Sequence, residues 1–85
     1  MESFRHYTKN NEGAVTFTFY KVFTVEGNQM MVIASDFNSQ FQMFYMEEVS
    51  GNWKIMQPEK VFHWIRFLEE QLSDAIIKHF EVEVQ

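Results

Sequence analysis

Residues 14–26 read AVTFTFYKVFTVE and begin the part of the chain that decides the fold. β-Branched and aromatic residues dominate this stretch, and such residues favour the pleated surface of a strand. With one exception every second position is apolar, and these positions are Val15, Phe17, Phe19, Phe23 and Val25. The exception is Lys21, which predicts a bulge or an edge exit at that point. The stretch therefore predicts a long strand with one buried face.

Four further strands are predicted around it from alternating apolar residues and from turn residues. The five predicted strands cover residues 3–8, 14–26, 29–36, 40–49 and 53–57. Gly27 and Asn28 are expected to close a tight hairpin, and Ser50-Gly51-Asn52 is expected to form another turn. The strands at 29–36 and 40–49 are apolar on both faces, which is typical of strands in the centre of a sheet.

A helix is predicted over residues 58–79. Pro58 suits the first helical position because an N–H there has no partner within the helix, and Glu59 complements the helix dipole. An apolar stripe recurs at spacings of three and four, and its members are Val61, Trp64, Ile65, Leu68, Leu72, Ala75, Ile76 and His79. The opposite side is expected to face solvent and carries Arg66, Glu69, Glu70, Ser73, Asp74 and Lys78. The alternation after His79 leaves residues 80–85 open between fraying, a longer helix and an edge strand.

These elements predict one α+β domain over residues 1–85, an antiparallel meander of four or five strands packed against one C-terminal amphipathic helix. A chain of 85 residues can build only one core. It contains no cysteine, so hydrophobic packing or self-association must supply the stability. The N-terminus carries no leader pattern and no stretch has the ~18 apolar residues of a membrane span. We therefore expect a complete cytoplasmic protein without a membrane segment.

Composition disfavours several classes of function. The formal net charge is −5, and the seven Lys and Arg residues are scattered along the chain, whereas proteins that bind phosphates normally cluster their cations. This distribution disfavours nucleic acid and anionic membranes as partners. The helix opens with an acidic residue and without a Gly-rich turn, which disfavours nucleotide binding. We expect no cofactor.

Enzymatic and metal sites are also weakly supported by the sequence. An acid/base site would need His6 or His79 beside one of the carboxylates Asp36, Glu47 and Glu48, and no motif fixes such a geometry. Glu59 and His63 are four residues apart on the predicted helix, which gives at most two metal ligands, and a structural zinc site needs four. We predict a protein that is not an enzyme and has no catalytic, cofactor or metal site.

The aromatic residues, at 18% of the chain, together with six Met exceed what one helix can cover. A second apolar sheet face needs a lid, and a twofold partner is the commonest one. The leading hypothesis is therefore a self-associating or partner-binding module. The expected partner is a second copy of the chain in a homodimer, and the alternative partner is an unidentified protein. The expected interface residues are Phe44, Met46, Phe62 and Phe67.

Two alternatives remain open. Met residues adapt to irregular shapes, so a pocket lined by Met30, Met31, Met43 and Met56 would suit an apolar ligand carrier. The meander followed by a helix also resembles the single-strand nucleic-acid binders of the Pur and Whirly types, which stack bases on sheet aromatics. That resemblance implies stacking by Tyr7, Tyr20, Phe23 and Phe44, with cations supplied by Arg5, Lys9, Lys21 and Lys54.

Overall fold

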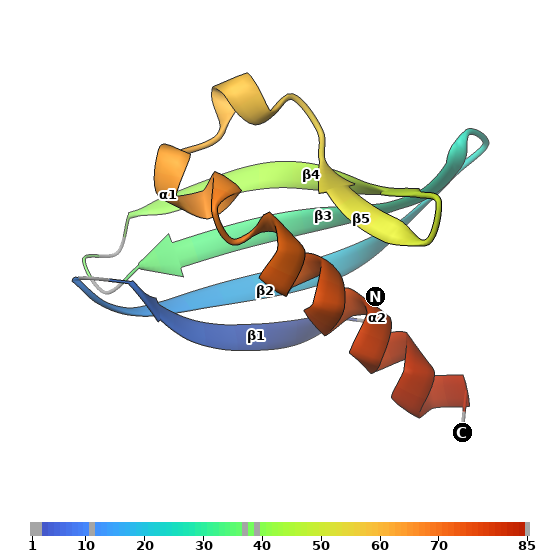
Figure 1. The fold of residues 1–85 in the computed structure, drawn as a ribbon, viewed down its shortest axis with the longest axis horizontal. Coiled ribbons are helices and arrows are strands. Elements are labelled where there is room, and N and C mark those ends of the chain that lie inside the picture. The colour runs from blue at the N-terminus through green and yellow to red at the C-terminus, as the bar shows by residue number, and fades with distance from the viewer. Residues whose placement is uncertain (1–2, 11, 37, 39, 85) are drawn as a thin grey trace.

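The protein is an α+β domain with a meander sheet, as the sequence predicts. The computed structural model describes residues 3–10, 12–36, 38 and 40–84. Within these residues five antiparallel strands follow one another in the order of the chain (Figure 1). They are β1 (Ser3–Asn10), β2 (Gly13–Thr24), β3 (Gly27–Asp36), β4 (Phe41–Val49) and β5 (Asn52–Ile55).

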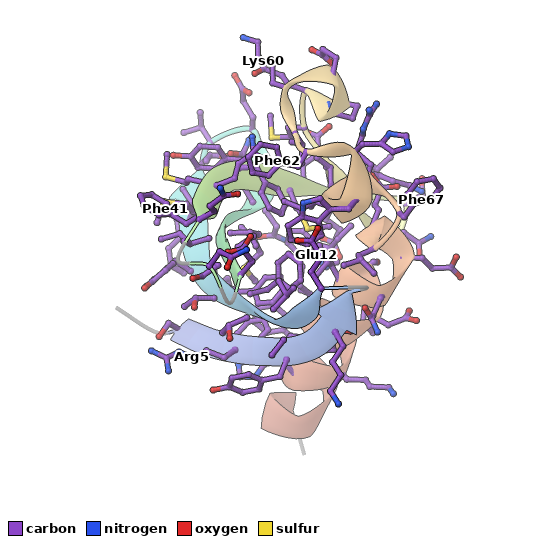
Figure 2. All side chains as sticks on the ribbon, turned by 90° about the vertical axis from the view of Figure 1, so that its left-hand side faces the viewer. Arg5, Glu12, Phe41, Lys60, Phe62 and Phe67 are labelled. Atoms are coloured by element: carbon purple, nitrogen blue, oxygen red, sulfur yellow. The ribbon has the colours of Figure 1, made fainter. Side chains whose placement is uncertain are left out.

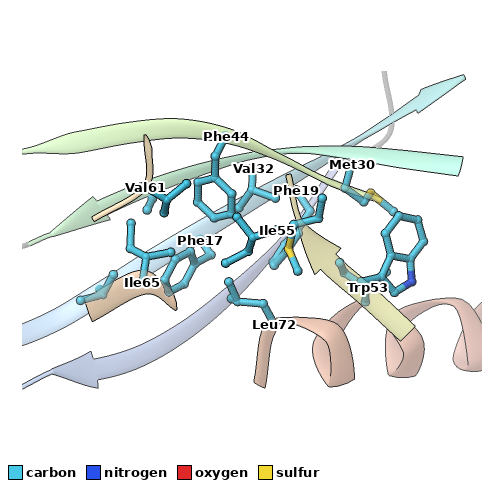
Figure 3. Packing of buried hydrophobic residues seen from close by; sticks show 14 residues of the cluster. Phe17, Phe19, Met30, Val32, Phe44, Trp53, Ile55, Val61, Ile65 and Leu72 are labelled. Carbon is cyan, nitrogen blue, oxygen red and sulfur yellow. The ribbon is translucent and has the colours of Figure 1, made fainter. Parts of the chain in front are cut away.

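Strict alternation in β2 separates a helix-covered face of the sheet from an open one. Val15, Phe17 and Phe19 are fully buried on the covered face. Because Phe17 pairs with Ala34 and Phe19 with Val32, the buried residues continue across β3. Figure 3 shows how these side chains meet those of the helical segments. The core comprises Val15, Phe17, Phe19, Met30, Val32, Ala34, Phe44, Met46, Trp53, Ile55, Val61, Ile65, Leu72 and Ile76.

Of two predicted hairpin turns, the turn between β4 and β5 is confirmed and the turn between β2 and β3 is displaced along the chain. The turn before β5 is confirmed, since Ser50 and Gly51 take φ angles of 54° and 86° between the paired residues Val49 and Asn52. The predicted turn at Gly27 and Asn28 is wrong by two residues. Thr24 pairs with Gly27, so the turn residues are 25 and 26, and Gly27 adopts a φ of 138° at the start of β3. A glycine is suited to that conformation because it lacks a Cβ atom.

The single helix predicted over residues 58–79 is wrong, because the chain forms three helical segments instead. A 3-10 turn, η1 (Pro58–Lys60), is followed by the one-turn helix α1 (His63–Arg66). The long helix α2 (Glu69–Val84) then crosses the sheet (Figure 1). Its backbone continues past residue 79, which selects the longer helix among the three alternatives.

The break before α1 has a local cause in β4. The side-chain amide of Gln42 donates to the carbonyl of Lys60 and accepts from the N–H of Phe62, both at 2.8 Å. These bonds hold backbone groups that a continuous helix would use itself. Val61 is correspondingly extended, with φ −103° and ψ 143°. β-Branched and aromatic residues such as Val61 and Phe62 also have low helix propensity.

The predicted apolar stripe is nevertheless confirmed, since all eight of its members are buried or half-buried. Two residues assigned to the solvent side are not exposed. Ser73 is only 4% exposed, and its hydroxyl oxygen accepts a hydrogen bond from the Trp53 N–H at 2.9 Å. Glu69 is half-buried, accepts from the Ile55 N–H at 2.9 Å and lies 3.7 Å from the amine of Lys54. Both side chains therefore provide hydrogen-bond acceptors for N–H groups on the outer edge of β5.

Lys21 causes no bulge, because its pairing with Met30 continues the regular register of β2 and β3. Its amine lies over the rings of Phe23 and Phe80, at 5.0 Å and 4.9 Å from their centroids. Phe80 belongs to α2, so a cation–π contact rather than a bulge accommodates the charge on the covered side. The part of β2 that follows Lys21 extends beyond the helix that covers this face, and Phe23 is therefore 83% exposed.

Candidate functional site: the open face and the edge of β4

The sheet face opposite the helices is an uncovered surface of mainly apolar and uncharged side chains, with Arg5 and Lys9 at its β1 edge and Glu47 on β4. We call it the open face and define it by Tyr7, Thr16, Thr18, Tyr20, Met31, Ile33, Phe41, Met43 and Tyr45. The register places Tyr20, Met31 and Tyr45 in one row across the strands. The next row is formed by Thr18, Ile33 and Met43.

Exposure on the open face is greatest on β1 and β4. Tyr7 is 67% exposed on β1, and on β4 Phe41 is 72% and Met43 53% exposed. Figure 2 places Phe41 and Arg5 on one side of the core and Phe67, on the helical side, at the other. Phe41, Met43 and Tyr45 follow one another on this face of β4, and such adjoining exposed apolar residues are typical of an interaction surface.

Two of the four predicted interface residues lie in the core. Phe44 is 5% exposed and Met46 is fully buried, both on the covered face of β4. The prediction was wrong for them because the sequence shows two apolar faces on this strand without showing which one the helix covers. Phe62 and Phe67 flank α1 and are exposed. The ring of Phe62 is stacked against that of Trp64, with the ring centroids 6.5 Å apart.

A second surface feature lies where β5 ends against β4. It is a groove of about 420 Å³ between β4 and the segment that leaves β5. We call it the β4-edge groove and define it by Met43, Phe44, Tyr45, Met56, Gln57, Lys60 and Val61.

The four Met residues predicted to line one pocket are divided by the sheet. Met30 is fully buried on the covered face, whereas Met31 and Met43 stand on the open face. Met43 and Met56 do come together in the β4-edge groove. Alternation within β3 sends neighbouring residues to opposite faces, so Met30 and Met31 cannot share a pocket on one side of the sheet.

The acid/base candidates lie on different elements, with His6 on β1, His79 on α2 and the carboxylates on β3 and β4. His79 stacks on Phe4 at 3.9 Å between ring centroids, and His6 pairs with Phe17, so both histidines belong to the covered side. Glu47 belongs to the open face because it pairs with Gln29.

The remaining carboxylates of that set have partners elsewhere. The Asp36 carboxylate accepts hydrogen bonds from the N–H groups of residues 38 and 40 at 2.9 Å, and Glu48 accepts from the Asn28 amide at 3.0 Å. Near α1, Nδ1 of His63 lies 3.0 Å from an Arg66 guanidinium nitrogen. No cluster of three metal-ligating side chains occurs among the residues that the structure describes.

The residues implied by the resemblance to single-strand binders are only partly brought together. Tyr7 and Tyr20 stand on the open face, as do Arg5 and Lys9 at its β1 edge. The other aromatic candidates, Phe23 and Phe44, belong to the covered side. The other two cations are also engaged elsewhere, Lys21 with aromatic rings and Lys54 with Glu69.

Comparisons with known proteins found no matching family model, no matching curated protein and no matching solved structure. Within the described part of the chain, no helix has both the length and the apolar character needed to cross a membrane.

Proposed function

We propose that this protein is a non-enzymatic binding module that pairs with a second copy of itself through the open face. The observation that carries the proposal is the row of the half-buried Tyr20 and Met31 and the exposed Tyr45, with the adjoining half-buried Ile33 and exposed Met43. Helices cover the opposite face of the same strands. A second sheet packed on the first at about 10 Å would remove these side chains from water.

The size of the open face suits a small dimer interface. Four strands at spacings of about 4.8 Å, with about seven residues of about 3.3 Å each, span roughly 19 by 23 Å. The area of roughly 440 Å² is that of the largest apolar patch on a typical monomer, which is often a functional surface. Interfaces at the small end of the range bury less than about 1,200 Å² in total, and we expect a dissociation constant in about the micromolar range.

The distribution of charge favours a second copy over a charged partner. Over β1 to β4 the centre of the open face is uncharged, and the cations Arg5 and Lys9 lie on β1. A twofold axis parallel to the strands would lay β1 of one copy over β4 of the other. Arg5 would then face a strand whose only open-face charge is the acidic Glu47, and no like charges would oppose each other.

Light scattering across a concentration series tests the proposal. The chain has a mass of 10.3 kDa, and we expect the measured mass to rise to twice that value with concentration. Ile33→Lys introduces a charge at the centre of the open face, so this variant should stay monomeric at every concentration. Far-UV circular dichroism checks that it is folded, and Tyr20→Lys provides a second position if it is not.

Phe67→Lys is the matched control, because Phe67 is 75% exposed on the helical side. This variant should dimerise like the unmodified protein. A monomer at all concentrations would refute the proposal, and dissociation by Phe67→Lys alone would transfer the interface to α1. Salt-sensitive binding of a labelled oligothymidylate to a monomer would support the single-strand alternative instead.

A further inference from the structure

Only half of the outer edge of β4 is covered by another strand. β5 pairs with Met46 to Val49 and stops. One more bond follows, from the Met56 N–H to the Tyr45 carbonyl at 2.8 Å. Gln57 then takes a left-handed conformation, with a φ of 52°, and directs the chain away from the sheet. Among the described residues no strand continues along the edge beside Met43.

The direction of the main-chain groups along this edge follows from the Tyr45 bond. The N–H and C=O of one residue in a strand point to the same side, and this side alternates from residue to residue. The Tyr45 carbonyl points toward β5, so the main-chain groups of Met43 and Phe41 point outward too. They offer two donors and two acceptors in the register that a further strand would use.

The β4-edge groove lies alongside these groups. It has a volume of about 420 Å³, and Met56 and the 7% exposed Val61 contribute to its lining. The two Gln42 bonds of 2.8 Å fix the main chain on both sides of Val61. Lys60 and Val61, which line one wall of the groove, are thereby held in place before any ligand binds. This lowers the entropic cost of binding. Lys60 is the charged member of the lining.

We propose that the β4-edge groove binds an extended peptide as an added strand. The peptide would run antiparallel to β4 in line with β5, with an apolar side chain in the groove and an acidic residue beside Lys60. Main-chain hydrogen bonds supply affinity in this mode, and pockets for alternate side chains supply specificity. β1 of a second copy fits poorly because it carries the cations Arg5 and Lys9. This site is additional to self-association through the open face.

Fluorescence anisotropy with a labelled, acetylated hexapeptide of alternating valine and glutamate tests this proposal. We expect saturable binding in the range of about 10 to 100 μM, because the cost of ordering a flexible peptide offsets part of the free energy gained from its contacts. The same peptide with alternate amides N-methylated should bind at least about fivefold more weakly, because it loses main-chain donors. An alternating valine and lysine peptide should also bind more weakly, since Lys60 repels it.

Two variants locate the site. Met43→Pro removes one outward N–H while leaving the ladder to β3 intact, and should weaken binding about fivefold. Lys60→Glu changes only an exposed side chain, and should weaken binding about two- to fivefold and less so at high salt. Lys78→Glu, an exposed charge reversal on α2, is the matched control and should bind normally.

Two outcomes would overturn the inference. One is equal affinity for the N-methylated and the unmodified peptide, and the other is unchanged affinity in Lys60→Glu. Repeating the titration with Ile33→Lys separates this site from the open face, because the peptide should still bind to a monomer. Loss of dimerisation and loss of peptide binding are therefore distinguishable failures.

Discussion

Phe17→Ala should destabilise the protein by about 3 to 5 kcal/mol, the range for removing a buried aromatic ring. Phe17 is completely buried at the middle of β2, and its ring centroid lies 6.3 Å from that of Trp64. The loss combines the transfer free energy of the ring with the cost of a cavity. A chain of 85 residues has a total stability of about 4 to 13 kcal/mol. The variant should therefore lose at least about a quarter of the total stability and unfold at a much lower urea concentration than the unmodified protein.

Phe23→Ala is the matched control on the same face of the same strand. Phe23 is 83% exposed, and the contact with Lys21 is worth only about 0.5 to 1 kcal/mol at an exposed site. Urea unfolding of both variants, at one fixed protein concentration, should give free energies of unfolding that differ by about 2 to 4 kcal/mol, and a lower midpoint for Phe17→Ala. Similar midpoints for the two variants would mean that the core does not centre on Phe17.

The contrast between Phe17 and Phe23 shows what strand periodicity can and cannot predict. Alternation assigns both residues to one face, and the structure confirms that assignment. Burial depends on how far α2 and the neighbouring strands extend over that face, which is a tertiary property. The same limit explains Phe44 and Met46, because an apolar pattern on both faces does not reveal which face the helix covers.

The helical region was predictable in its burial pattern but not in its continuity. The spacing of Ile65, Leu72 and Ile76 identified the face that packs on the sheet. The interruption depends on Gln42, a residue of β4 whose side chain binds the backbone on either side of Val61. Side-chain bonds between residues 18 and 20 positions apart leave no local signal in the sequence.

The candidate site divides in the same way. Strand alternation suggested a surplus apolar face, and the register of β2, β3 and β4 places that face opposite the helices. The β4-edge groove could not be predicted, because it depends on where β5 ends. The sequence extends that strand to residue 57, whereas the positive φ of Gln57 turns the chain away two residues after Ile55.

The outer edge of β5 leads to the second large expected effect, which concerns Ser73. An unpaired strand edge is a template for aggregation, and proteins protect such edges. Here α2 supplies the acceptors directly, from Ser73 to the Trp53 N–H and from Glu69 to the Ile55 N–H, each at 2.9 Å. Hydrophobic packing alone would bring the helix to this edge and leave the two donors unpaired.

Ser73→Ala should therefore cost about 1 to 3 kcal/mol, because it leaves a buried N–H without an acceptor. Asp74→Ala, at the exposed neighbouring position, should change stability by no more than about 0.5 kcal/mol. Hydrogen exchange provides a direct readout, since the Trp53 amide should lose protection in Ser73→Ala and keep it in Asp74→Ala. Unchanged protection of that amide in Ser73→Ala would show that the hydroxyl is not its partner. The edge of β5 would then be protected by packing against α2 rather than by the hydrogen bonds that α2 provides.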